Sequence, residues 1–415
     1  MKIVSGKQIA RELKKQVERR ILFSAETEKL VSRIVNDVRK NGEKALRRYA
    51  EKFDGLGAKQ PLTVLQQEMK SALDSVSPEF RRALEAAAKN IRQFAEWQKP
   101  HSFSREIQEG INVGQVVRPL DSVGCYVPGG RYPLPSTLLM TVIPAQVAGV
   151  GEIAVVSPRP AAETLAAAAL LGVKTFYRIG GAQAVAALAY GTKSVKAVNK
   201  IVGPGNKYVT TAKKLVAFDC AIDFLAGPTE ALVVSDEGDP RFIASDLLAQ
   251  AEHDPDASVV FVTTYAPLAA KVAAELKMAS KSNPIASESL ATNCVLFVTD
   301  SREQTVEIAN AIASEHITIP RDYLNDITSA GSIFIGDYSA QSLGDYATGP
   351  NHTLPTGGVA RYRGGLSVMD YLKVITVQEV SREGIREIGP VVETLATAEG
   401  LQAHAQSVRV RCANA

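Results

Sequence analysis

Cysteine and histidine are scarce in this chain of 415 residues. The four cysteines are far apart and form no CxxC pair: Cys125, Cys220, Cys294 and Cys412. A disulfide framework and a zinc–thiolate site are therefore not expected. The five histidines are His101, His253, His316, His352 and His404. A metal site would have to combine members of this short set with carboxylate or amide oxygens.

The chain also lacks a strong charge of either sign and a long apolar run. With 47 Lys and Arg against 44 Asp and Glu, its formal net charge is +3, which gives no reason to expect nucleic acid or a membrane as partner. No apolar run approaches the roughly 20 residues that span a bilayer. Residues 1–20 are rich in charge and lack the apolar core of a secretory signal, so we expect a cytoplasmic protein.

Hydrophobic periodicity divides the chain into a helical first part and two blocks in which strands and helices alternate. The first hundred residues read as helices, with a break at Asn41-Gly42 and a helix capped by Ser77-Pro78. The alternation in the following blocks, up to residue 335, is typical of parallel sheets with crossover helices. Residues 340–367 are rich in Gly, Pro, Tyr and Asn, and loops of that length are usually functional. The last 45 residues return to a helix-like pattern.

Three glycine-rich segments lie in the first α/β block. Residues 124–131 (GCYVPGGR) include Tyr126, which offers a flat face or a hydroxyl to a ligand, although an ordinary turn explains the segment equally well. Residues 180–183 (GGAQ) and 203–206 (GPGN) each open a helix, where free N–H groups attract phosphate. Neither matches GxGxxG, so they suggest a dinucleotide site of a different kind, with purely steric turns as the alternative. Cys125 reads as a buried, inert thiol rather than a nucleophile.

Three polar segments carry groups suited to metal binding or proton transfer. In residues 250–253 (QAEH), the first and last side chains reach the same point of a helix surface, although a solvated helix end is the plainer interpretation. The Glu315-His316 dipeptide sets an imidazole of near-neutral pKa beside a carboxylate. Asp345 and His352 lie in residues 342–356, where Asp, Asn and Gly also build turns without chemistry.

Taken together, these segments resemble the histidinol dehydrogenase family. In the family's order they read GCYVPGGRYPLPSTLLM, GGAQAVAALAYGT, KIVGPGNKYV, DFLAGPTE, DLLAQAEHDPDA, GDYATGPNHTLPT and AEGLQAH. The resemblance implies an NAD-dependent dehydrogenase of histidine biosynthesis that takes L-histidinol through L-histidinal to L-histidine with two NAD+. It also implies an α/β fold of two incomplete Rossmann-like domains, one inserted in the other, with helical N- and C-terminal extensions, in an intertwined homodimer.

The same resemblance implies a domain division. Residues 1–24 would be the N-terminal extension, and residues 25–120 plus 231–375 would form the first Rossmann-like domain with a helical N-terminal part. Residues 121–230 would form the inserted second Rossmann-like domain. Residues 376–415 would be a C-terminal extension that contributes to the partner's active site.

The resemblance further implies the residues of the site. The expected Zn²⁺ ligands are Gln250, His253, Asp345 and His404. The expected NAD contacts are Tyr126, Gln183 and Asn206. The expected contacts to the substrate, L-histidinol, are Thr229, Gln250, His253, His316, Asp345, Glu399 and His404. The expected catalytic acid/base pair is Glu315 and His316.

The sequence departs from the family's pattern in three places. Thr229 stands where Ser is usual, and Ser314 stands where Pro is common. Residues 361–368 (RYRGGLSV) are not the commonest version of their segment. These differences leave open a dehydrogenase of the same scaffold that acts on another small polar alcohol, such as a sulfonated diol. A zinc hydrolase and a non-catalytic nucleotide-binding or assembly protein are further alternatives.

Overall fold

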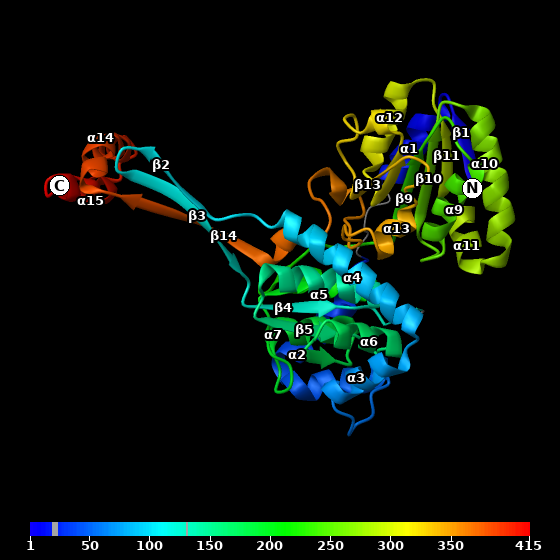
Figure 1. Cartoon of the computed structure of the whole chain (residues 1–415), viewed down its shortest axis with the longest axis horizontal. Helices are drawn as coiled ribbons and strands as arrows, with labels where there is room; N and C mark the ends of the chain where they lie inside the picture. The colour runs from blue at the N-terminus through cyan, green and yellow to red at the C-terminus, as the bar shows by residue number, and fades with distance from the viewer. Residues whose placement is uncertain (19–23, 130–131) are drawn as a thin grey trace.

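The computed structural model describes residues 1–18, 24–129 and 132–415. It has two parallel sheets, each flanked by helices, and a long arm that projects from beside the smaller sheet and carries the C-terminus (Figure 1). The mixed α/β class with parallel sheets that the sequence predicts is confirmed. Part of two expected segments lies outside the described residues, namely 19–23 of the N-terminal extension and 130–131 of the first glycine-rich segment.

Within the described residues, the larger sheet has six parallel strands in the order β1-β11-β10-β9-β12-β13. The strands are β1 (Lys2–Ser5), β9 (Glu230–Val234), β10 (Ser258–Thr263), β11 (Cys294–Val298), β12 (His316–Ile319) and β13 (Ser332–Ile335). The helices are α1 (Gln8–Glu18), α9 (Pro240–Ala251), α10 (Ala266–Ala279), α11 (Pro284–Asn293) and α12 (Arg302–Ile312). Along β10, Val259 and Phe261 enter one core, and Val260 and Val262 enter the other. The strand is almost continuously apolar because helices cover both faces of the sheet.

The smaller sheet is parallel and has the order β6-β5-β4-β7-β8. Its strands are β4 (Ser122–Tyr126), β5 (Glu152–Val156), β6 (Thr175–Tyr177), β7 (Lys200–Val202) and β8 (Ala221–Ile222). Its helices are α5 (Pro135–Ala148), α6 (Ala162–Leu170), α7 (Gly181–Tyr190) and α8 (Lys207–Val216). The chain runs from β4 outward to β6 and then crosses to β7 on the other side of β4. Ligands of such sheets bind at the carboxyl ends of the strands where the order reverses, which is here between β4 and β7.

Three further helices pack around the smaller sheet: α2 (Ala25–Tyr49), α3 (Gln66–Ser75) and α4 (Pro78–Gln98). Helix α2 contacts α7 and α8, α3 contacts α6, and α4 contacts α5. The expected division grouped these helices with residues 231–375 instead. They lie with the smaller sheet because apolar side chains of α2, such as Val35 and Leu46, share one core with α7. The predicted break in α2 is observed at Gly42, and Ser77 caps α4 as predicted.

The N-terminal residues also have a role that the sequence did not predict. Residues 2–5 form β1, which pairs in parallel with β11 at the edge of the larger sheet. Residues 1–24 are therefore not only an extension, because they supply a strand to that sheet. The smaller sheet with its helices follows in the chain between β1 and β9, so it interrupts the larger sheet in sequence.

The arm consists of a three-stranded antiparallel sheet followed by two helices. The strands are β2 (Phe103–Gln108), β3 (Ile111–Pro119) and β14 (Leu372–Val380), and the helices are α14 (Arg382–Ala398) and α15 (Gln402–Cys412). This sheet was not predicted from the sequence, and the prediction that the last 45 residues are helical is wrong for β14. Strands β2 and β14 are exposed along nearly their whole length, so they lack the buried–exposed alternation that marks a strand in sequence.

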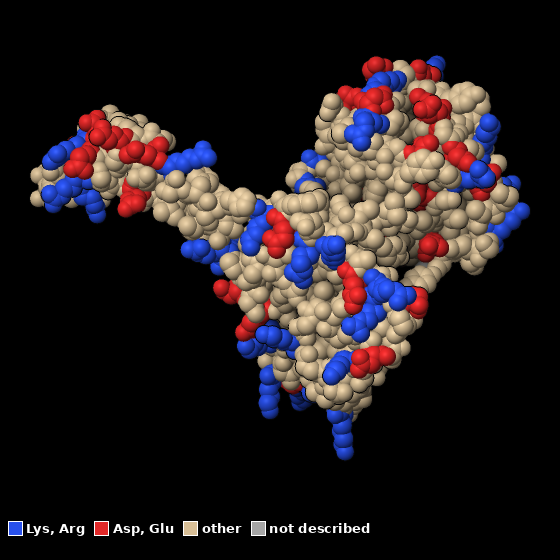
Figure 2. Space-filling model, viewed as in Figure 1, with Lys and Arg blue, Asp and Glu red and all other residues tan. Residues whose placement is uncertain are grey.

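Figure 2 shows acidic and basic side chains interspersed over the visible face of the two sheet units. On the arm, charged side chains gather at its end, over α14 and α15, whereas the stretch over the strands is largely uncharged in this view. None of the helices in the described ranges combines the length and the apolar character that a membrane crossing needs.

Candidate active site

A cluster of buried polar side chains lies at the amino ends of the strands of the larger sheet. His316 is the first residue of β12, and Glu315 directly precedes it. Gln250 comes from the last turn of α9, and Asp345 comes from the short helix α13 (Gln341–Tyr346). Crossover helices run antiparallel to the strands, so the end of α9 and the start of β12 meet at the same edge of the sheet.

Asp345 connects the members of the cluster. Its Oδ2 accepts a hydrogen bond from Gln250 Nε2 at 3.1 Å, and its Oδ1 lies 3.2 Å from His316 Nε2. Its main-chain oxygen is 2.7 Å from Nδ1 of His352, whose Nε2 is 3.2 Å from Thr137 Oγ1. Thr137 belongs to the first turn of α5, which follows β4 in the smaller sheet. His352 therefore links the cluster to the second sheet unit.

The electrostatics of the cluster favour proton exchange. Burial raises the pKa of Glu315 to about 8, against the opposing effects of His316 and of the Glu230 N–H, which donates to Glu315 Oε2 at 3.1 Å. Burial disfavours the protonated form of His316, but Glu315 and Asp345 outweigh burial and raise the pKa of the imidazole. A carboxyl group whose pKa lies near neutrality can both accept and donate protons at physiological pH.

His316 is buried, yet neither of its ring nitrogens has a hydrogen-bond partner within residues 1–18, 24–129 and 132–415. Its Nδ1 lies 3.8 Å from Glu315 Oε2, and its Nε2 lies 3.2 Å from Asp345 Oδ1 without the alignment of a hydrogen bond. Buried polar atoms are normally hydrogen-bonded. An imidazole in this state, beside an ionisable carboxyl group, is suited to receive a ligand hydroxyl.

The expected metal ligands are only partly brought together. Gln250 and Asp345 are hydrogen-bonded, and the exposed His253 lies one turn beyond Gln250. Burial lowers the pKa of the neighbouring His352, and the charges of His316 and His253 act in the same direction. His404 is exposed in α15 on the arm, remote from the larger sheet in Figure 1. In the described parts of one chain, no group of three or more His, Cys, Asp or Glu side chains is arranged to hold a metal ion.

The donor types still suit zinc. An imidazole nitrogen and a carboxylate oxygen are common zinc ligands, and an amide oxygen is a weaker one. Gln250 and Asp345 are in contact, and His253 follows Gln250 by one turn, so these three donor types lie in one part of the chain's fold. The residues present therefore fit a zinc site that is completed by a further imidazole.

The other expected substrate contacts are likewise divided between the larger sheet unit and the arm. Thr229 is half-buried directly before β9, and its main-chain oxygen accepts from the Ser258 N–H at 2.8 Å. Glu399 is exposed at the end of α14, on the same arm as His404. Ser314, which replaces the common Pro, is buried, and its hydroxyl has no hydrogen-bond partner in the described chain.

The expected NAD contacts lie around the point where the strand order of the smaller sheet reverses. Tyr126 is the last residue of β4, and its hydroxyl accepts from the Gly181 N–H at 3.0 Å. Gln183, in the first turn of α7, donates to Asp54 Oδ2 at 3.1 Å. Asn206 follows β7 and caps α8. Tyr126 and Asn206 come from the carboxyl ends of β4 and β7, where a dinucleotide is expected, and Gln183 comes from α7, whose Gly181 N–H contacts Tyr126.

The expectation of free N–H groups at these helix starts is wrong for four groups, the N–H groups of residues 180, 181, 208 and 209. The Gly180 N–H donates to Asp54 at 3.2 Å, and the Gly181 N–H donates to Tyr126. Asn206 Oδ1 accepts from the N–H groups of residues 208 and 209 at 3.0 and 3.2 Å. Side chains of the protein thus occupy the positions that a phosphate would take in a conventional fingerprint.

Asp54 and His352 are site residues whose roles the sequence did not assign. Asp54 lies at the end of a π-helical turn, Ala50–Asp54, and nothing in its local sequence distinguishes it from an acidic residue at an ordinary helix end. Cys125 is fully buried, and burial raises the pKa of its thiol to about 12. The expectation that Cys125 is buried is therefore confirmed, and a thiol with a raised pKa is a poor nucleophile.

Asp54 provides a test of this arrangement through the pH dependence of stability. Burial raises the pKa of its carboxyl group above the ordinary value of 3.8, against hydrogen bonds from Gly180 and Gln183 and the charge of Arg159. Its contribution to stability is therefore fully present below the ordinary pKa and is lost as pH rises through the folded pKa. We expect the free energy of unfolding of Asp54→Asn, relative to the parent protein, to increase from about pH 4 upward.

Urea denaturation at a series of pH values measures this difference. Asp37→Asn is the control of opposite sign, because the Tyr49 hydroxyl and other donors lower the pKa of Asp37. The relative stability of Asp37→Asn should fall as pH rises toward about 4 and then stay constant, so its pH dependence has the opposite sign and a lower pH range. A difference for Asp54→Asn that stays constant with pH would contradict the assignment.

Known proteins resemble this chain over almost its full length. The histidinol dehydrogenase family model matches residues 17–412. The chain is 45% identical over 399 residues to histidinol dehydrogenase of Aquifex aeolicus, covering 94% of this chain and 93% of that protein. It is also 45% identical over 396 residues to histidinol dehydrogenase of Methanothermobacter thermautotrophicus, with 92% of each chain covered.

A solved structure agrees with these sequence relatives. The crystal structure of histidinol dehydrogenase from Elizabethkingia anophelis has a TM-score of 0.95 and 37% sequence identity to this chain. The match covers 100% of this chain and 98% of that one. The chain belongs to the histidinol dehydrogenase family.

Proposed function

We propose that this chain catalyses the oxidation of L-histidinol to L-histidine through L-histidinal, with reduction of two NAD+, as a zinc-dependent enzyme of histidine biosynthesis. The observation that carries the proposal is the buried cluster of Glu315, His316, Asp345 and Gln250, in a chain related over more than nine-tenths of its length to histidinol dehydrogenases. The cytoplasmic location expected from the sequence stays a prediction.

The sulfonated diol considered as an alternative substrate has no support from the site. A sulfonate is recognised by cations, whereas the described cluster offers the carboxyl groups of Glu315 and Asp345. The hydrolase and the non-catalytic alternatives do not explain membership in a family of NAD-dependent oxidoreductases.

Gln250, His253 and Asp345 of one chain and His404 of a second copy would hold the zinc ion. Zinc has no redox chemistry of its own and, when bound, polarises the oxygen of the substrate alcohol or aldehyde. NAD+, the hydride acceptor, would contact Tyr126, Gln183 and Asn206 at the carboxyl ends of β4 and β7.

His316 would accept the alcohol proton in the first oxidation. Its position beside Glu315 and Asp345 stabilises the imidazolium that results. Glu315 would then take a proton from the water that attacks the aldehyde, and a pKa near neutrality suits this transfer. The hydrated aldehyde supplies the second hydride, and its carbon is thereby oxidised to the carboxylate of L-histidine.

Substrate orientation would depend on residues of both copies. Thr229 lies beside the cluster at the start of β9 and offers a hydroxyl to the substrate. Glu399, from the arm of the second copy, would pair with the imidazole of L-histidinol. Holding the aldehyde between two chains keeps it from solvent before the second oxidation.

The proposal of a homodimer with shared sites is supported by the arm. His404 and Glu399 lie at its end, away from Gln250 and Asp345 of the same chain (Figure 1). Strand β14 also exposes apolar side chains, including Val374, 46% exposed, and Ile375, 48% exposed. Apolar surface of this extent on a projecting element is typical of a surface that another chain covers.

The yield of NADH per molecule of L-histidinol tests the proposed reaction. Complete conversion of a limiting amount of L-histidinol by excess NAD+ should give two NADH for each L-histidine formed. Absorbance of NADH and chromatography of the product measure the two quantities. A yield of one NADH with accumulation of the aldehyde, or no NADH at all, would refute the proposal.

Replacement of His316 tests its role as the base. We expect His316→Asn to lower the rate of L-histidinol oxidation by about 10²–10⁴-fold, the usual contribution of a general base, with zinc content unchanged. Steady-state kinetics and atomic absorption measure the two effects. His101→Asn, the same change at an exposed histidine, is the control and should keep the parent rate. Equal rates for the two variants would remove His316 from the mechanism.

Replacement of His404 tests the sharing of sites. His404→Ala should lose zinc and activity together, whereas Gln402→Ala, on the same exposed helix, should keep both. Heterodimers of inactive His404→Ala and inactive His316→Asn chains should regain activity, because one of the two sites then has an intact set of side chains. Verified heterodimers that stay inactive would argue against shared sites.

A further inference from the structure

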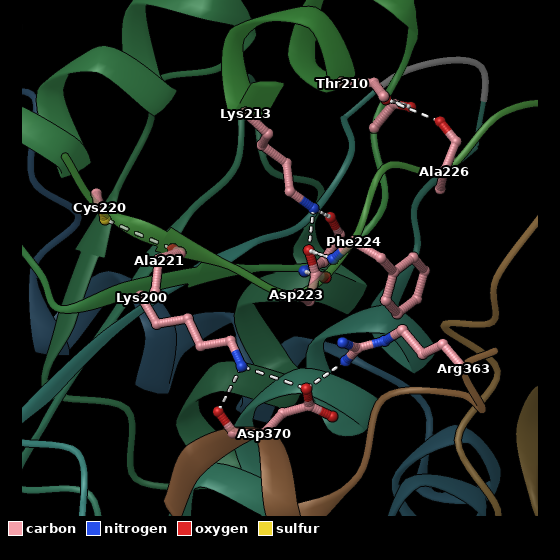
Figure 3. A network of polar contacts seen from close by, with 12 residues as sticks. Lys200, Thr210, Lys213, Cys220, Ala221, Asp223, Phe224, Ala226, Arg363 and Asp370 are labelled. Carbon is pink, nitrogen blue, oxygen red and sulfur yellow. Dashed lines mark hydrogen bonds and ion pairs between the residues drawn. The ribbon is translucent and has the colours of Figure 1, made fainter. Parts of the chain in front are cut away.

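A buried ion pair lies beneath the turn at residues 203–206. Lys213 of α8 and Asp223, which follows β8, are in direct contact, and their side chains are only 3% and 1% exposed (Figure 3). Moving two charges out of water is costly, and such a pair is often no more stabilising than apolar side chains of similar volume. Its position therefore calls for a reason other than general stability.

The pair holds both main-chain polar groups of Gly203, its N–H and its carbonyl. Asp223 Oδ2 accepts from the Gly203 N–H at 2.7 Å, and Lys213 Nζ donates to the Gly203 carbonyl at 3.0 Å. The other carboxylate oxygen, Oδ1, accepts from the Phe224 N–H at 2.6 Å. Three elements, namely the end of β7, helix α8 and the segment after β8, are thus joined at this residue.

Gly203 in turn contacts the first expected NAD residue. Its φ is 110°, and a Cβ atom added to it would lie 2.2 Å from the main-chain oxygen of Tyr126. Only glycine therefore fits between β7 and β4 at the point where the strand order reverses. Any shift of the Gly203 peptide changes the spacing between Tyr126 and the turn.

The remainder of the turn is held by a side chain of α8, the same helix that carries Lys213. The Thr210 hydroxyl donates to the Gly205 carbonyl at 3.3 Å and to the Ala226 carbonyl at 2.9 Å. Asn206, the last residue of the turn, is fixed as the cap of α8 by its bonds to the following N–H groups. The side chain expected to contact NAD is therefore at the end of a turn whose first peptide is anchored by the ion pair.

We propose that Lys213 and Asp223 are positioning residues for NAD+, which set the distance between Tyr126 and Asn206 by holding Gly203. This inference rests on the proposed NAD site and deepens it, because both side chains are too buried to contact a dinucleotide directly. A displacement of the turn should weaken the binding of NAD+. It should leave intact the polar cluster around His316 and Asp345 in the larger sheet, where L-histidinol is proposed to bind.

The same strand offers a matched control. Lys200, at the start of β7, donates to the Asp370 carbonyl at 2.7 Å and to its carboxylate at 3.2 Å (Figure 3). These two side chains are 13% and 11% exposed. Arg363 also contacts the Asp370 carboxylate, so Lys200 belongs to a second, nearly buried cluster of charges at the opposite end of β7, away from the turn.

The experiment compares Lys213→Met and the double variant Lys213→Met/Asp223→Asn with Lys200→Met in the full-length, zinc-loaded enzyme. The double variant removes both charges, so it avoids the cost of one buried unpaired charge if the single variant folds poorly. The measurements are KM for NAD+, KM for L-histidinol, kcat at saturating NAD+, NADH affinity by fluorescence titration, and the thermal unfolding midpoint.

We expect the two turn variants to raise KM for NAD+ and Kd for NADH about 10-fold or more, because small displacements of binding groups have large effects. KM for L-histidinol and kcat should stay near the parent values, as for the loss of uniform cofactor binding. Lys200→Met should lower the unfolding midpoint and leave both NAD constants unchanged.

Two results would overturn the proposal. One is an unchanged NADH affinity in the folded double variant, and the other is an equal loss of affinity in Lys200→Met at matched thermal stability. If the parent protein fails to oxidise L-histidinol, the proposed reaction fails, but the NADH titrations still decide whether the pair positions a dinucleotide site.

Discussion

The arrangement of the buried polar cluster, which consists of Gln250, Glu315, His316 and Asp345, depends on the contacts of the Asp345 carboxylate. A largely buried carboxylate must be hydrogen-bonded or paired, or it takes up a proton. Gln250 donates to one of its oxygens and His316 stands at ion-pair distance from the other, so its pKa is lowered although burial acts to raise it. Contacts to this single side chain bring together the end of α9, the start of β12 and the short helix α13, which are widely separated in sequence.

The two sheets present opposite ends of their strands to the proposed reaction. The buried polar cluster lies at the amino ends of β12 and β9, whereas the proposed NAD contacts lie at the carboxyl ends of β4 and β7. Residues 351 and 352, which follow α13, connect the two sheet units. His352 contacts Thr137, and Asn351 Nδ2 donates to the Met140 carbonyl at 2.6 Å, both on α5. The loop is therefore ordered by side-chain hydrogen bonds to the smaller sheet unit rather than by a ladder of its own.

Much of the secondary structure could be predicted from periodicity, because buried parallel strands and their helices leave strong local signals. Strands such as β10 and β11 and helices such as α4 and α10 follow the expected pattern closely. The arm could not be predicted in this way. Its strands β2 and β14 are exposed, so their side chains carry no alternation of polarity, and the pairing of β14 with β3 joins residues more than 250 positions apart.

The candidate site shows the same division between local and tertiary information. The sequence alone determined the donor types, the scarcity of histidine and cysteine, the Glu315-His316 dipeptide, and the family motifs that include Gln250 and Asp345. Only the tertiary structure decided that Asp54 and Tyr126 accept from helix N–H groups expected to be free, and that α15, which carries His404, is remote from α9, which carries Gln250, within one chain (Figure 1). The reason is physical: hydrogen bonds and burial depend on which distant segments pack together, and no local pattern of residue types encodes that packing.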